Sequence, residues 1–161
     1  MKADDPRLEQ SRQEMFERAA KMDALSLAVL RSHLLAEQSM GDYLLANGKK
    51  PNWVKKQNFR AKMETCKRFA KEDGANELWG VLNAANQLRN KIAHTLLSDK
   101  IAGKMKQLKD RCLACLTAKQ AADLALQSDD YIAQSACLTC AGFIVTLTDQ
   151  LARKSADVAA T

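Results

Sequence analysis

The chain has 161 residues, of which 47% are hydrophobic and 27% charged, and its formal net charge is +6 at pH 7. This composition excludes a disordered chain, and we identify no apolar run of the roughly 20 residues that a membrane-spanning helix needs. The first six residues lack the apolar stretch of a signal peptide, and the five cysteines are typical of reduced thiols. We therefore expect a cytoplasmic protein without a membrane partner.

Long segments rich in Ala, Leu, Lys, Glu and Gln, with few glycines and only two prolines, favour helix along most of the chain. Alternating β-branched segments are missing. We therefore predict an all-α fold, a single up-and-down bundle of five to six helices that covers residues 1–161 as one domain. In chain order the helices are expected at about residues 6–21, 23–46, 53 or 57–71, 77–97, 101–126 and 130–153, with a polar tail at about 154–161.

Residues 48–71 contain nine cations against one acid, Glu64, with Trp53, Phe59 and Phe69 interleaved. Clustered cations beside aromatic rings suit the phosphates and bases of a nucleic acid. A solvated helix face whose aromatics turn into the core explains the same pattern. The candidate RNA-binding residues of this segment are Lys49, Lys50, Lys55, Lys56, Arg60 and Lys62.

The run from Leu88 to His94 brings an arginine, a carboxamide and one of only two histidines into one predicted helix. Because a helix turns about 100° per residue, Asn90 and His94 share a face. Arg89 points about 140° away from His94, although its long side chain can reach the same cleft. Arginine suits a phosphate and histidine exchanges protons near neutral pH, so the run is a candidate catalytic site. An ordinary hydrogen-bonded helix surface is the alternative.

This run, an arginine, a polar residue, three further positions and a histidine, resembles the signature of the HEPN superfamily of all-α domains. The segment from Arg31 to Glu37 and the basic helix after it resemble smaller stand-alone HEPN-like proteins. The resemblance covers roughly residues 20 to 150. In one toxin branch a tyrosine follows two residues after the histidine, and here that position is Leu96.

The resemblance implies a metal-independent endoribonuclease without a cofactor, usually a homodimer in which two motifs form one cleft. His94 would be the general acid or base, Arg89 would hold the scissile phosphate, and Asn90 would position the phosphate or the histidine. The products would be a 2′,3′-cyclic phosphate and a 5′-hydroxyl. The resemblance also suggests a toxin or phage-defence effector, with an antitoxin or regulatory protein as a further partner. The alternative is a non-catalytic HEPN-like dimer that regulates or scaffolds.

Two residues are candidates for orienting the catalytic groups. Asn86 lies on nearly the same helix line as Asn90 and His94. Glu37 shares a helix face with His33. It could orient a catalytic histidine from a neighbouring helix, or pair with Arg31 or Lys21.

Two C-x-x-C units lie late in the chain, and four thiolates at such spacing could hold zinc. Each unit lies in an apolar helical pattern, where residues three apart share a face. We therefore favour buried core cysteines, with zinc as the alternative. The four residues are Cys112, Cys115, Cys137 and Cys140.

Overall fold

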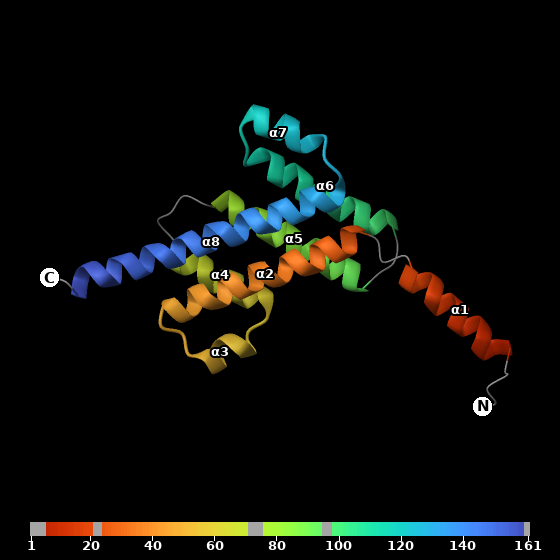
Figure 1. Ribbon diagram of the computed structural model, residues 1–161, viewed down its shortest axis with the longest axis horizontal. Helices are drawn as coiled ribbons and strands as arrows, with labels where there is room; N and C mark the ends of the chain where they lie inside the picture. The colour runs from red at the N-terminus through yellow and green to blue at the C-terminus, as the bar shows by residue number, and fades with distance from the viewer. Residues whose placement is uncertain (1–5, 21–23, 71–75, 95–97, 160–161) are drawn as a thin grey trace.

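The computed structural model (Figure 1) describes residues 6–20, 24–70, 76–94 and 98–159, and its regular structure there is entirely helical. The predicted all-α fold is thus confirmed, but eight helices are described instead of five to six. They are α1 (Pro6–Ala20), α2 (Ala24–Ala46), α3 (Pro51–Lys56), α4 (Phe59–Phe69), α5 (Asn76–His94), α6 (Ser98–Ala114), α7 (Ala118–Ala125) and α8 (Asp129–Ala159). The helix ends predicted at residues 21, 23, 71 and 97 lie outside the described residues.

The additional helices arise because two predicted helices are each divided by a capping residue. The Asn58 side chain accepts the backbone N–H of Ala61 at 2.9 Å and starts α4 after the short α3. Thr117 forms a reciprocal capping box with Gln120 and starts α7. A capping side chain satisfies an N–H that the first turn of a helix leaves without a partner, so each cap stabilises a new helix start inside an apolar pattern.

Of the predicted C-terminal ends of two other helices, one agrees with the structure and one does not. α2 ends at Ala46, and Gly48 adopts the left-handed φ of 77° that glycine tolerates at a helix C-terminus. The predicted helix end at residue 46 is thus confirmed, whereas α3 begins at Pro51, before the predicted start at residue 53 or 57. The predicted helix end at residue 153 is wrong, because α8 continues to Ala159 and so includes the described part of the expected polar tail.

The core lies where α2, α5 and α8 meet. α8 runs beside α2 (Figure 1), α5 packs against both, and α6 covers the other side of α5. α4 packs against α2 and α5 and completes the wall that faces the candidate site, whereas α1 extends away from the packed helices (Figure 1). The largest fully buried side chains are Met40, Leu44, Leu82, Leu88, Met105, Leu108, Ile132 and Ile144.

One helix, α8, is long and apolar enough to cross a membrane by length and composition, with a mean hydropathy of 1.4. The prediction that no segment is long and apolar enough to span a membrane is therefore wrong by this criterion. In the structure 44% of the apolar window is buried within the protein, including Ile132 and Ile144. The core helix of a soluble protein has the same features, and the packing of α8 on α2 and α5 accounts for its buried half.

Candidate functional site

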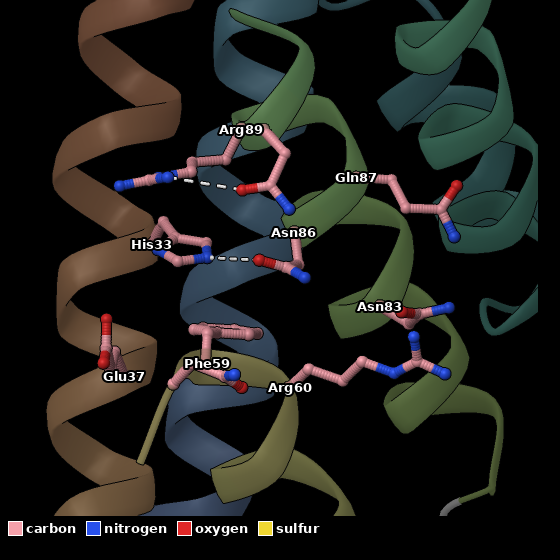
Figure 2. Close-up of a pocket in the computed structure, with 10 residues that line it drawn as sticks. His33, Glu37, Phe59, Arg60, Asn83, Asn86, Gln87 and Arg89 are labelled. Carbon is pink, nitrogen blue, oxygen red and sulfur yellow. Dashed lines mark hydrogen bonds between the residues drawn. The ribbon is translucent and has the colours of Figure 1, made fainter. Parts of the chain in front are cut away.

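A cavity of about 630 Å³ lies between α2, α4 and α5. Its walls are mostly polar and carry two guanidinium groups, one carboxylate, one imidazole and five carboxamides (Figure 2). The lining residues are His33, Glu37, Asn58, Phe59, Arg60, Asn83, Asn86, Gln87, Arg89 and Asn90. The cavity thus combines hydrogen-bond donors with positive charge.

α5 supplies half of this lining because its polar residues recur at steps of three and four. Asn83, Asn86 and Asn90 therefore share one face of the helix and all line the cavity. Arg89 lies beside this face, and its Nη1 donates to Asn90 Oδ1 at 3.3 Å. The structure thus brings together two of the three predicted catalytic residues, with Asn86 one turn away.

His94 is not part of this cavity. It is the last residue of α5 and is exposed, four residues beyond Asn90. Within one chain the structure therefore separates the predicted proton-transfer residue from the cavity that contains Arg89 and Asn90.

His33 occupies the cavity instead, and the sequence analysis gave it no role of its own. The residue is 4% exposed, its ring stacks on Phe59 with a centroid distance of 4.0 Å, and Nε2 lies 3.2 Å from Asn86 Oδ1. Burial lowers the pKa of His33, and the charge of Arg89 acts in the same direction, while the Asn86 hydrogen bond and Glu37 oppose the shift. The one feature of the sequence that indicated His33 was its position on the same face of the helix as Glu37.

Glu37 is the only carboxylate among the described residues that line the cavity. Its Oε1 pairs with Lys62 Nζ of α4 at 2.7 Å, so the expected alternative partner, Arg31, is not its partner here, and Lys21 lies outside the described residues. Lys62 has a side chain only 12% exposed and is thus no free surface cation. The two arginines of the cavity, Arg60 and Arg89, pair with no carboxylate among the described residues.

The other predicted RNA-binding cations lie between α2 and α3 and in α3, and they do not line the cavity. Lys49 Nζ stands over the rings of Trp53 and Phe69, at 5.2 and 5.5 Å from their centroids. Such contacts stabilise a cation while leaving it near the surface. Of the six predicted cations, only Arg60 lines the cavity, and it reaches from α4 toward α5 (Figure 2). The three that are exposed in and beside α3 are Lys50, Lys55 and Lys56.

Cys112 lies on α6 and Cys115 directly follows the end of that helix, while Cys137 and Cys140 lie on α8. Cys112, Cys137 and Cys140 are buried, and Cys140 Sγ lies 3.4 Å from the carbonyl oxygen of Leu78. Burial raises the pKa of each of these thiols. In the described part of the chain, no three His, Cys, Asp or Glu side chains form a group that could hold a metal ion. The contacts of these thiols are those of small core side chains.

Comparisons with protein-family models, curated protein sequences and solved structures give no match for this chain. The function is therefore argued from the site itself and from the motif on α5.

Proposed function

We propose that this protein is a metal-independent endoribonuclease whose substrate phosphate binds in the cavity between α2, α4 and α5. The observation that carries the proposal is the charge balance of this cavity. Arg60 and Arg89 have no carboxylate partner among the described residues, while the one carboxylate, Glu37, is paired with Lys62. Two guanidinium groups that pair with no carboxylate of the described residues, in a concave polar site, are suited to an anion, because arginine donates paired hydrogen bonds to phosphate oxygens.

Arg89 is the residue that we assign to the scissile phosphate. Its contact with Asn90 orients the guanidinium beside a carboxamide that can also donate to a phosphate oxygen. Charge that develops on the phosphoryl oxygens in the transition state is then stabilised by donors that are already in place. Asn90 is accordingly a positioning residue for both Arg89 and the phosphate.

His94 is assigned to proton transfer. It lies four residues beyond Asn90 on the same face of α5, which is about 6 Å along the helix axis, and it is exposed. An RNA strand that is bound at Arg89 and continues along α5 would therefore meet the imidazole of His94. His94 would take the proton of the 2′-hydroxyl or give a proton to the leaving 5′-oxygen.

The reaction uses an internal nucleophile. The ribose 2′-oxygen forms a bond to phosphorus as the bond from phosphorus to the 5′-oxygen breaks, which leaves a 2′,3′-cyclic phosphate and a 5′-hydroxyl. This chemistry is restricted to RNA, since DNA lacks the 2′-hydroxyl. The exposed cations Lys50, Lys55 and Lys56 would add affinity that does not depend on RNA sequence.

The resemblance of the motif to HEPN proteins supports a second copy of the chain as a partner. Because His94 lies outside the cavity of its own chain, a homodimer could bring this residue to a cleft that two copies share. A toxin or phage-defence role, with an antitoxin or regulatory protein that restrains it, belongs to the same proposal.

The second candidate function is a non-catalytic RNA-binding or regulatory module. The separation of His94 from Arg89 in the single chain favours it, because binding needs the donors of the cavity but no proton transfer. The two functions differ in the fate of bound RNA.

Cleavage of RNA in excess EDTA by the wild type, by His94→Ala and by Lys91→Ala tests the proposal. Lys91 is a neighbouring residue of α5 and serves as the matched control. We expect cleavage with cyclic phosphate ends by the wild type and by Lys91→Ala, and a loss of about 10²-fold or more in His94→Ala at an unchanged melting temperature. Bound but intact RNA in all three samples would favour the regulatory module instead.

A further inference from the structure

The buried contact between His33 of α2 and Asn86 of α5 joins two cavity residues that lie 53 positions apart in the chain. Asn86 Oδ1 faces His33 Nε2, and Figure 2 shows the amide nitrogen of Asn86 pointing away from His33. Both residues line the cavity. The orientation of the carboxamide therefore decides whether a bound anion meets an N–H donor or a carbonyl oxygen.

We propose that Asn86 is an anion-binding donor of this cavity and that His33 is the positioning residue that holds its amide group in the donating orientation. This inference rests on the proposed function, since the anion is the phosphate of bound RNA. It adds to Arg89 and Asn90 a third donor, which the α5 motif does not contain.

The spacing along α5 supports this assignment. Arg89 and Asn90 lie three and four residues beyond Asn86, so the three side chains belong to neighbouring positions on one helix face. Asn90 Oδ1 is already occupied by Arg89 Nη1, which leaves its amide nitrogen to donate. Two carboxamides, each with its oxygen engaged inside the protein, would thus present N–H groups beside one guanidinium.

His33 is suited to hold the carboxamide because its own position and protonation are restricted. Stacking on Phe59 fixes the plane of its ring. Burial lowers its pKa, so the imidazole is neutral at neutral pH and carries one ring proton. Because Asn86 Oδ1 can only accept, that proton lies on Nε2, and His33 donates to Asn86.

The charges around His33 come from three helices. Glu37 lies one turn away on α2, where Lys62 of α4 pairs with it, and Arg89 approaches from α5. Glu37 raises the pKa of His33 and Arg89 lowers it. Neither charged group replaces the contact with Asn86, so the amide orientation depends on His33 itself.

Substitutions at both residues separate the donor role from general packing. Glutamine places a side-chain N–H near the position of a histidine Nε2, so His33→Gln keeps a donor for Asn86, whereas His33→Leu removes it. Asn86→Asp keeps the oxygen that accepts from His33 but replaces the outward amide with a carboxylate oxygen. Asn83→Asp makes the same charge change on the same wall of the cavity and is the matched control.

The measurement is the affinity for a single-stranded oligonucleotide that is 2′-O-methylated throughout and so cannot be cleaved, with the melting temperature of each variant. We expect His33→Gln to bind within about threefold of the wild type and His33→Leu to bind about tenfold more weakly. Asn86→Asp should lose more affinity than Asn83→Asp. The double variant His33→Leu/Asn86→Asp should bind no more weakly than Asn86→Asp alone, because the first residue acts through the second.

Equal losses in Asn86→Asp and Asn83→Asp would overturn the proposal, since they would reveal a general effect of charge. Wild-type affinity in a folded His33→Leu variant would also overturn the proposal, but it would not contradict the proposed ribonuclease activity. If the wild type binds the oligonucleotide as expected but leaves natural RNA uncut, the donor role stands and the ribonuclease fails. A folded wild type that binds no RNA contradicts both.

Discussion

Replacement of Arg89 by glutamine removes one guanidinium from the cavity and keeps a polar side chain of similar length. Arg89 is half-buried, and its guanidinium donates a hydrogen bond to Asn90 Oδ1. A hydrogen bond to a charged group contributes about 1.5–3 kcal/mol. Loss of the contact to a phosphate therefore weakens RNA binding by about 10- to 150-fold.

The salt dependence gives an independent magnitude. Each phosphate contact with a single strand contributes about 0.7 to the slope of log affinity against log salt concentration, so Arg89→Gln should flatten this slope by about 0.7. The free energy of unfolding should change little, because no carboxylate among the described residues loses a partner. Anisotropy of a labelled, 2′-O-methylated strand at several salt concentrations measures both quantities.

Arg153→Gln is the matched control, since Arg153 is exposed on α8 and carries the same charge. It should retain an affinity within about twofold of the wild type, because an exposed charge far from a bound phosphate is largely screened. Equal losses of affinity and slope in the two variants would refute the assignment of Arg89 to the phosphate, since they would report only net charge.

Three further predictions concern Glu37, His33 and the cysteines. Glu37→Gln releases Lys62 from its ion pair, so RNA affinity should rise about threefold and stability fall by up to about 1 kcal/mol; weaker binding in anisotropy titrations would contradict this. The pKa of His33 is lowered in the folded chain, so the unfolded chain takes up a proton first. The stability linked to His33 is therefore complete above about pH 6.5 and is lost as pH falls through the lowered pKa. Urea midpoints at pH 7.5 and 5.5 should differ more in the wild type than in His33→Gln, and equal differences would count against a buried neutral imidazole. Cys140 is 2% exposed and its pKa is raised by burial, so a thiol reagent at pH 8 should label the partly exposed Cys115 in the native state and Cys140 only after unfolding, as mass mapping can test.

Helix α5 shows how much of the fold could be predicted from local pattern. Its buried positions include Val81, Ala85 and Leu88, members of the stripe at steps of three and four that the sequence displays, and its described bounds lie within a few residues of the predicted ones. The start near Asn58 was left open between residues 53 and 57, and the break at Thr117 was missed because apolar periodicity continues on both sides. Their capping side chains were the local signal that periodicity alone does not weigh.

Several residues that line the cavity, among them Glu37, Arg60 and Asn86, were candidates from the sequence, but the contacts that join the helices of the site could not be predicted from it. Arg89 and Asn90 could be identified together because they belong to one run on α5. The contact of His33 with Asn86 joins residues 53 positions apart, and no helical period reports such a contact. In the sequence Lys62 cannot be distinguished from a surface cation, because its pairing with Glu37 depends on the fold.

The central claim is cleavage of RNA through the ribose 2′-hydroxyl at a cavity that contains Arg89. Its most direct test is a DNA oligonucleotide with one internal ribonucleotide, incubated in excess EDTA with the wild type and with Arg89→Gln. The proposal predicts that the wild type makes a single cut, directly after the ribonucleotide, and leaves a 2′,3′-cyclic phosphate, while Arg89→Gln leaves most of the strand intact. Cuts at the deoxynucleotides would contradict the proposal. So would a wild type that leaves both this strand and an all-RNA strand uncut.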